Sequence, residues 1–216
     1  EILRCLVGSE MCIRDSRGFI LPKFFLENCG AYLAAIRSIG RTEEYFYMPV
    51  FESAAMIPPQ TRREALTEVR AQLDTVSGSI LNIRVGGNDL SHAFGLRRPA
   101  NRTIYDLRPV ADILIDIVAA FGTQYVVSGP VWEYYSGEGW EEGLRREMEL
   151  DLLNGFTGKT VIHPNQIPVV NEMLRVSQRD YADARAILNW DTGSGSLVLS
   201  LIHISEPTRH LRISYA

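Results

Sequence analysis

Two acidic residues close successive apolar stretches of the chain and are the first candidates for chemistry. Glu52 follows the aromatic and apolar run YFYMPVF, and Asp89 follows ILNIRV and a glycine pair. If the two runs are adjacent parallel strands, both carboxylates lie at the same edge of a sheet. Carboxylates, waters and substrate oxygens together form the octahedron that Mg²⁺ requires, and such an ion stabilises the enolate formed when a bond beside a carbonyl breaks. Glu52 and Asp89 can therefore share a divalent cation such as Mg²⁺.

Each carboxylate also has a purely structural interpretation. Glu52 suits an N-cap or an ion-pair partner at the start of the following helix, and Asp89 before Leu90 suits a helix cap. Capping and metal binding both place an acidic residue at the end of a strand. The sequence therefore leaves the two interpretations open.

Further polar and small residues stand at the predicted strand ends. Lys23 ends an apolar run, where a cation suits a carboxylate or phosphate; a solvated surface lysine is the alternative. Gly86 and Gly87 allow close backbone approach and unusual dihedral angles, and Asn88 separates them from Asp89. An ordinary transition from strand to loop explains the glycines equally well. We expect Lys23, Asn88 and the glycine pair to line the substrate site.

The last β-type run ends in His163, Pro164 and Asn165. An imidazole there suits contact with a ligand, although a core histidine bonded to the backbone fits the same position. His92, beyond Asp89, has no identifiable partner in the sequence, and we interpret it as structural. No order of Ser, His and Asp and no reactive-cysteine context indicates covalent catalysis.

The candidate residues must be positioned by two alternating kinds of element. Apolar β-type runs are followed by stretches that can be helical, and the clearest of these has one apolar face. The β-type runs are residues 18–23, 45–52, 80–89, 125–130 and 159–164. The apolar face consists of Val110, Ile113, Leu114, Ile117, Val118 and Phe121. The alternation predicts an α/β fold with a parallel sheet, either open and doubly wound or closed as an eight-stranded barrel.

Similar patterns indicate three more helices. One apolar stripe ends before Gly78, a suitable helix stop, and comprises Leu66, Val69, Leu73 and Val76. A second stripe lies in a charged segment and comprises Leu144, Met148 and Leu152. Ser177 and Asp180 have the spacing of a capping box and predict the start of the last helix.

The composition narrows the class of protein. The formal net charge is −4 and the pI is near 5.6, without a block of Lys and Arg, so neither nucleic acid nor an anionic membrane is an expected partner. No apolar run reaches the roughly 18 residues of a membrane helix, and the first residues lack the pattern of a signal peptide. The three cysteines have neither metal-ligand spacing nor the count of a disulfide framework. We expect a cytoplasmic enzyme.

Both ends of the chain have the sequence of a translated adapter. The segment LVGSEMCIRDS, residues 6–16, resembles the translation of a transposon-type sequencing adapter. The reverse complement of the same oligonucleotide encodes LSLIHISEPTR, which stands at residues 199–209. Two unrelated natural segments do not encode opposite strands of one oligonucleotide. We therefore expect residues 1–16 and 199–216 to be artificial, and residues 17–198 to carry the function.

The ordered strand ends resemble those of a known family. The segments FILPK (19–23), a strand ending in Glu52, GGNDLSHAFG (86–95), SGP (128–130) and GFTGKTVIHPNQI (155–167) are similar to strands four to eight of the citrate lyase β-subunit and HpcH/HpaI aldolase superfamily. The last segment is the most specific, because Gly158 to Ile167 fits the family's Gly-Lys-x-x-Ile-His-Pro-x-Gln-Ile stretch throughout. The aromatic-rich strand and the loop GGNDLSHAFGLRR resemble the divergent carbon–carbon bond lyase branch.

The resemblance implies the C-terminal part of a TIM (β/α)₈ barrel and a reversible aldol- or Claisen-type cleavage. It assigns Mg²⁺ to Glu52 and Asp89 and places Lys23 near the acidic group of the substrate. The loop 163–165 matches one that lies near the coenzyme A arm in thioester-using members. Gly87 and Asn88 replace the family's common alanine and glutamate, so the resemblance does not fix the substrate. The family's first three strands, with the arginine that grips the substrate carboxylate, and a C-terminal lid are not in this sequence.

The leading hypothesis is a Mg²⁺-dependent carbon–carbon bond lyase for a small carboxylic acid or an acyl-CoA thioester, in a protein expected to form a homo-oligomer. The polypeptide as given is expected to be an inactive fragment, since it lacks the substrate arginine and three strands. The first alternative is a non-catalytic barrel that binds a metabolite. The second is an open-sheet enzyme that binds nucleotide phosphates at a helix N-terminus, although the sequence has no glycine fingerprint for it.

Overall fold

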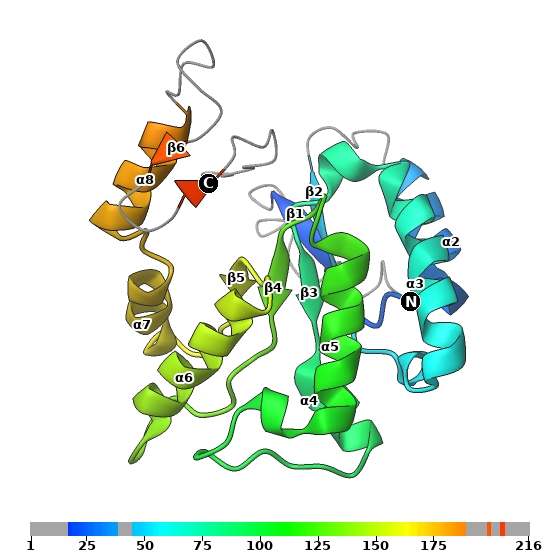
Figure 1. The fold of residues 1–216 in the computed structure, drawn as a ribbon. Helices are drawn as coiled ribbons and strands as arrows, with labels where there is room; N and C mark the ends of the chain where they lie inside the picture. The colour runs from blue at the N-terminus through cyan, green and yellow to red at the C-terminus, as the bar shows by residue number, and fades with distance from the viewer. Residues whose placement is uncertain (1–16, 39–44, 189–197, 200–203, 206–216) are drawn as a thin grey trace. The chain divides into compact units, whose positions relative to one another are not determined.

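The computed structural model of the chain describes residues 17–38, 45–188, 198–199 and 204–205 (Figure 1). Within these residues, the predicted β-type runs form one five-stranded parallel sheet in the order β1-β2-β3-β4-β5. Neighbours in the sheet are thus neighbours along the chain, without the reversal of order that defines a doubly wound sheet. Sequential order is that of a βα barrel, so the structure favours the barrel over the open sheet.

The strands are shorter than the predicted runs. Their bounds are β1 Gly18–Leu21, β2 Phe46–Phe51, β3 Ile83–Val85, β4 Val127–Gly129 and β5 Gly158–Lys159. The run predicted over 80–89 is wrong at its end, because Gly87 already begins a helix. The run predicted over 159–164 is wrong beyond Lys159, because residues 160–165 form a loop.

Helices follow the strands, and α2, α3 and α5 lie side by side against one side of the sheet (Figure 1). The helices of this part are α2 Leu26–Ser38, α3 Pro59–Asp74, α4 Gly87–Ala93, α5 Arg108–Phe121, α6 Trp140–Leu153 and α7 Gln166–Met173. Short 3₁₀ turns are η2 Ala54–Met56, η3 Ser77–Ser79 and η4 Ile104–Asp106. In α3 the predicted residues Leu66, Val69 and Leu73 are buried, but the helix ends at Asp74. Val76 therefore lies outside it and is only partly buried, and Gly78 is not its stop.

Helix α5 supplies the centre of the core. Its predicted apolar face is confirmed, since Val110, Ile113, Leu114, Ile117 and Phe121 are all fully buried. The ring of Phe121 lies 4.9 Å from that of Phe51 on β2, centroid to centroid. Burying one such aromatic or aliphatic side chain contributes roughly 1.5–3 kcal/mol, so this face fixes the helix against the sheet.

The strand register divides the sheet into two faces. Val50 on β2 pairs with Arg84 on β3, Arg84 pairs with Ser128 on β4, and Ser128 pairs with Gly158 on β5. Paired residues in a parallel sheet point to the same side, and residues alternate along each strand. These residues therefore share one face, called the inner face below. The opposite face, with Phe51 and Ile83, packs into the core with the helices.

The inner face exposes apolar side chains. Ile20 on β1, Phe46 on β2 and Val126 before β4 are exposed by 50%, 44% and 39%. By the register and the two-residue period of a strand, all three belong to the inner face. In a closed barrel, such side chains fill the interior in layers.

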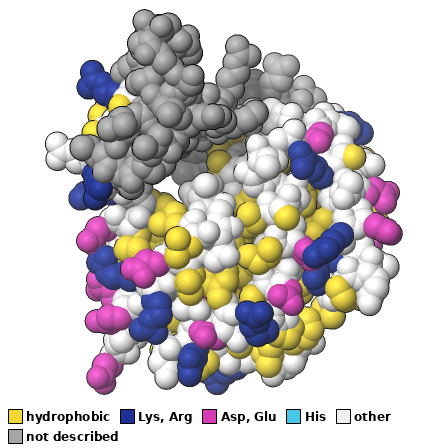
Figure 2. Space-filling model, viewed as in Figure 1, with side chains coloured by type: hydrophobic (Ala, Val, Ile, Leu, Met, Phe, Trp, Pro, Cys, Tyr) yellow, Lys and Arg dark blue, Asp and Glu magenta, His cyan; other side chains and the backbone are white. Residues whose placement is uncertain are grey.

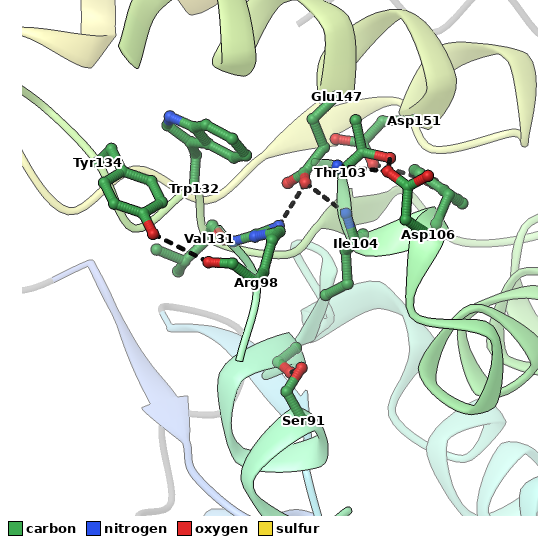
Figure 3. A network of polar contacts seen from close by, with 12 residues as sticks. Ser91, Arg98, Thr103, Ile104, Asp106, Val131, Trp132, Tyr134, Glu147 and Asp151 are labelled. Atoms are coloured by element: carbon green, nitrogen blue, oxygen red, sulfur yellow. Dashed lines mark hydrogen bonds and ion pairs between the residues drawn. The ribbon is translucent and has the colours of Figure 1, made fainter. Parts of the chain in front are cut away.

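Helix α6 departs from its predicted apolar stripe. Leu144 and Met148 are buried as predicted, but Leu152 is 42% exposed. The carboxylates of Glu147 and Asp151 take the buried face of the helix instead. Figure 3 shows both side chains projecting from α6 into a network of polar contacts.

Glu147 is the centre of this buried network. Its carboxylate pairs with Arg98 and accepts a hydrogen bond of 2.8 Å from the backbone N–H of Ile104 (Figure 3). Lys159 Nζ lies 2.8 Å from Glu147 Oε1 and 2.7 Å from Asp151 Oδ2. Burial raises the pKa of the Asp151 carboxyl, and the ammonium of Lys159 opposes that shift. The network ties the loops after β3 and β4 to α6 and the end of β5.

The second unit begins at Leu174 and contains α8 Gln178–Leu188 with the antiparallel pair β6 Val198–Leu199 and β7 Ile204–Ser205. The predicted capping box is confirmed, because the N–H of Asp180 donates to Ser177 Oγ at 3.0 Å and the two side chains bond at 2.7 Å. The expected artificial segment 1–16 lies outside the described residues. Of the expected segment 199–216, only residues 199 and 204–205 are described.

The surface is mixed in charge. On the face shown in Figure 2, basic and acidic side chains are interspersed and do not gather by sign. Among the described residues, every helix is too short or too polar to cross a bilayer.

The buried network generates a stability prediction. Glu147→Gln removes the charge that Arg98 and Lys159 share, which leaves the buried Arg98 without a carboxylate partner and Lys159 with Asp151 alone. We expect the free energy of unfolding of the full-length protein to fall by about 3–5 kcal/mol, measured by urea denaturation. Glu149→Gln, on the exposed side of the same helix, is the matched control and should leave it unchanged. Equal stability of the two variants would contradict the role given to the network.

Candidate active site

A cavity of about 450 Å³ lies at the C-terminal ends of β1 and β2, beside α4. It brings together the three predicted catalytic residues Lys23, Glu52 and Asp89. The other lining residues are Glu27, Asn28, Ser53, Ala54, His92 and Ala93. The predicted meeting of two carboxylates and a lysine at one rim of the sheet is therefore what the structure shows.

Glu52 is held from two sides. The backbone N–H of Lys23 donates to Glu52 Oε1 at 3.0 Å. On the other side, a Cβ placed on Gly86 would lie 2.2 Å from Glu52 Oε2, so only glycine leaves room for the carboxylate. Ser53, rather than Glu52, caps the following turn by accepting from the N–H of Ala55 at 3.2 Å. The helix-cap interpretation of Glu52 is wrong.

Asp89 lies inside the first turn of α4, whose N-cap position is Gly86. Its helix-cap interpretation is therefore also wrong. Asp89 Oδ2 lies 3.4 Å from Lys23 Nζ, and the two side chains are 44% and 70% exposed. An ion pair this open to water contributes about 1 kcal/mol or less, so a stronger cation displaces the lysine at little cost.

Lys23 adopts a left-handed backbone conformation with φ of 50°. For a residue with a side chain this conformation costs roughly 1–2 kcal/mol. It is fixed by Asn28, whose Nδ2 donates to the Lys23 carbonyl at 2.7 Å and whose Oδ1 accepts from the N–H of Phe25 at 3.0 Å. The strained turn aims the Lys23 N–H at Glu52, and strain of this kind concentrates at functional sites.

The glycine pair serves close packing. A Cβ on Gly87 would lie 2.5 Å from Ile104 Cδ1 and 2.7 Å from Pro130 Cβ. Gly86 has φ of −89°, and neither glycine has a positive φ. The predicted close backbone approach is confirmed, and Gly86, with ψ of 72°, has the predicted unusual dihedral angles outside both the helical and the extended regions. Asn88 lies in α4 and does not line the cavity.

The predicted ligand loop lies apart from this cavity. The His163 ring stacks on Tyr135 at 4.2 Å, and its Nδ1 accepts from the N–H of Asn165 at 3.2 Å. Asn165 Nδ2 donates to the Tyr135 carbonyl at 3.2 Å. The loop that contains Pro164 is thus ordered by an aromatic contact, and its residues do not line the cavity. The substrate-binding role of His163, Pro164 and Asn165 stays a prediction.

His92, like Glu27, Asn28 and Ser53, is a cavity residue that the sequence did not assign to the site. It is exposed, and it lines both this cavity and a second one of about 600 Å³ that also includes Arg97, Glu133 and Tyr134. The interpretation of His92 as structural stays a prediction. Its spacing within α4 was the available signal, because His92 stands one helical turn after Asp89 and so shares its face.

The donor set of the cavity suits Mg²⁺. Glu52 and Asp89 supply hard oxygen donors, and Mg²⁺ in proteins is held by one or two carboxylates while keeping waters or substrate oxygens. Within the part of the chain that the structure describes, no His, Cys, Asp or Glu cluster of three or more could hold a metal ion. The two carboxylates are therefore the ligands that these residues offer, and Asp89 already contacts one cation, the Lys23 ammonium.

The sequence has a match among protein families. The profile of the C-C bond lyase family of the TIM-barrel fold matches residues 3–213. A curated protein, the L-malyl-CoA/β-methylmalyl-CoA lyase of Cereibacter sphaeroides, is 38% identical to this chain over 74 residues. That match covers 33% of this chain and 22% of the length of the Cereibacter protein.

Solved structures share the fold. The protein CitE of Mycobacterium tuberculosis, in complex with magnesium, acetoacetate and coenzyme A, has a TM-score of 0.59 and 19% identity, over 93% of this chain and 70% of that one. RipC of Yersinia pestis has a TM-score of 0.58 and 16% identity, over 81% of this chain and 76% of that one. At such identities the likeness concerns the fold alone.

The contact of Gly86 with Glu52 generates a second prediction. Gly86→Ala forces the carboxylate away from its position, and we expect a loss of about 1–3 kcal/mol in the free energy of unfolding of the full-length protein. Gly30→Ala is the control, because Gly30 is an exposed position in α2 with nothing within 4 Å of an added Cβ. The free energy of unfolding of the Gly30→Ala variant should rise by about 1 kcal/mol. Urea denaturation measures both, and a Gly86→Ala protein as stable as wild type would contradict the close approach.

Proposed function

Since this chain belongs to the C-C bond lyase family of the TIM-barrel fold, we propose that it is part of a Mg²⁺-dependent lyase that cleaves a carbon–carbon bond beside a carbonyl group. The observation that carries this proposal is the gathering of Lys23, Glu52 and Asp89 around one cavity at the C-terminal ends of parallel strands. That edge of a βα barrel is where active sites lie.

Each residue has a distinct part in the proposed site. Glu52, fixed between the Lys23 N–H and Gly86, is a preorganised metal ligand that needs little rearrangement. Asp89 is the second ligand and exchanges its exposed pairing with Lys23 for the metal. Lys23 is then free to neutralise an acidic group of the substrate. When bound, Mg²⁺ supplies Lewis acidity to the carbonyl oxygen beside the bond that breaks.

A small carboxylic acid or an acyl-CoA thioester is the proposed substrate class. The names of two relatives support it, since one is a malyl-CoA lyase and the other was solved with acetoacetate and coenzyme A. The cavity of about 450 Å³ has room for a small acid, and its lysine complements a negative charge. A cytoplasmic location and a homo-oligomeric assembly stay predictions.

We further propose that the five strands are strands four to eight of the barrel. The exposed inner-face side chains Ile20, Phe46 and Val126 support this assignment, because strands one to three would cover them. A sheet left open at this face has unpaired edges and exposed apolar surface. On this account the complete barrel, with its first strands, is the active form.

The lyase assignment is tested on the full-length protein. We expect Mg²⁺-dependent release of a carbonyl product from short hydroxy acids or their CoA thioesters, measured by trapping the product with phenylhydrazine. Glu52→Gln and Asp89→Asn should each lower kcat/KM by about 10³-fold, because losing the metal removes roughly 4 kcal/mol of transition-state stabilisation. Asp112→Asn, at an exposed position of α5, is the control and should retain activity.

Two outcomes would overturn the assignment. One is unchanged cleavage in both the Glu52 and the Asp89 variants. The other is ligand-induced thermal stabilisation of the full-length protein without turnover of any substrate, which would favour a non-catalytic barrel that binds a metabolite.

A further inference from the structure

Arg84 is a charged residue in the middle of strand β3, between the buried residues Ile83 and Val85. Those two neighbours belong to the core, so Arg84 lies on the inner face of the sheet. Its position pairs with Val50, two residues before Glu52. Glu52 and Arg84 therefore share one face of adjacent strands.

Arg84 does not line the cavity itself, but the strand register places it two residues below the rim at which Glu52 lies. The N–H of Gly86 donates to the Phe51 carbonyl, which continues the register and sets Gly86 beside Glu52. The N–H of Thr160 likewise donates to the Gly129 carbonyl, so Thr160 continues β5 to the same level. Arg84 Nε lies 3.4 Å from Thr160 Oγ1, so the arginine extends toward the layer of the candidate site.

Arg84 differs from other arginines of the fold in its pairing. Arg62 and Arg98 are buried, and each has a carboxylate partner, Asp116 for the first and Glu147 for the second. Arg84 is half-buried, and the Thr160 hydroxyl is its single hydrogen-bond partner among the described residues. Burial lowers the pKa of the Arg84 guanidinium, and the charge of Glu52 offsets this shift in part. The charge is thus partly removed from water, and no carboxylate of the described residues is in contact with it.

We propose that Arg84 binds a carboxylate of the substrate at the end opposite to the reacting carbonyl. Two of its guanidinium nitrogens remain available to donate hydrogen bonds to the two oxygens of one carboxylate. Thr160 contacts the guanidinium through Nε at 3.4 Å, which leaves the two terminal nitrogens without a hydrogen-bond partner among the described residues. The inference deepens the proposed lyase function and rests on it for the position of the substrate. It makes the substrate an acid with one carboxylate beyond the cleaved bond.

A purely structural role makes different predictions. If Arg84 pairs with a carboxylate of a barrel strand outside the described residues, its loss breaks a buried ion pair and lowers the unfolding temperature. If Arg84 is a substrate residue, its loss removes an uncompensated buried charge. The unfolding temperature of Arg84→Gln then stays equal to wild type or rises.

The test is calorimetric titration of the full-length protein with malonate, a carboxylate that cannot turn over as a substrate, in EDTA and in Mg²⁺. We expect Arg84→Gln to weaken malonate binding by about 10-fold or more in both conditions, since a charged hydrogen-bonded pair is lost. Arg84→Lys keeps the positive charge without the planar guanidinium, and its affinity for malonate should fall several-fold. Arg37→Gln, at the end of α2, is the control and should bind as wild type.

The outcomes separate the two proposals. If Arg84→Gln and Arg84→Lys bind malonate within twofold of the wild-type affinity, the role of Arg84 is overturned. It is also overturned if the binding of inorganic phosphate depends on Arg84 and the binding of malonate does not. If Arg84→Gln does not fold, that too overturns it. Arg84-dependent malonate binding in a protein without lyase activity would leave this inference standing and refute the proposed function.

Discussion

Parallel pairing of consecutive strands is the constraint on which the candidate site depends. The register from Val50 through Arg84 to Ser128 brings the C-terminal ends of the strands to one level. Glu52 and Gly86 become lateral neighbours there, although they are far apart in the sequence. The absence of a side chain at Gly86 then lets the carboxylate lie against the backbone of the next strand. A shift of one residue in the register of a strand would turn its inner-face side chains toward the core.

Charged side chains on the two sides of the sheet differ in burial and in pairing. On the helix side, the network around Glu147 is deeply buried and each of its carboxylates contacts a cation, so it holds loops in place. At the rim, the Lys23–Asp89 pair is open to water, and Arg84 has no carboxylate in contact among the described residues. Buried networks of paired charges rigidify a fold. Charges that are open to water or lack a carboxylate in contact remain available to a ligand, and this contrast supports the proposal that the rim is the functional side.

Much of the fold followed from the sequence, because apolar periodicity is a local property. The five strand positions and the buried face of α5 are examples, and Glu52 and Asp89 could be placed at one rim because parallel strand ends coincide. Glu147 was not predicted as buried, since its partner Arg98 is 49 residues away and no local pattern reports it. The left-handed turn at Lys23 was also not predictable, because a lysine gives no signal for it. Contacts made only in the folded chain decide both features.

The central claim is that Glu52 and Asp89 hold one divalent cation between them. The most direct measurement is an electron paramagnetic resonance titration of the full-length protein with Mn²⁺, an ion that also takes oxygen ligands. The account predicts one Mn²⁺ bound per polypeptide, with binding lost in Glu52→Gln and in Asp89→Asn. Binding should persist in Glu27→Gln, which changes a third carboxylate of the same cavity. Undiminished Mn²⁺ binding by the Glu52 and Asp89 variants, or none by the wild-type protein, would contradict it.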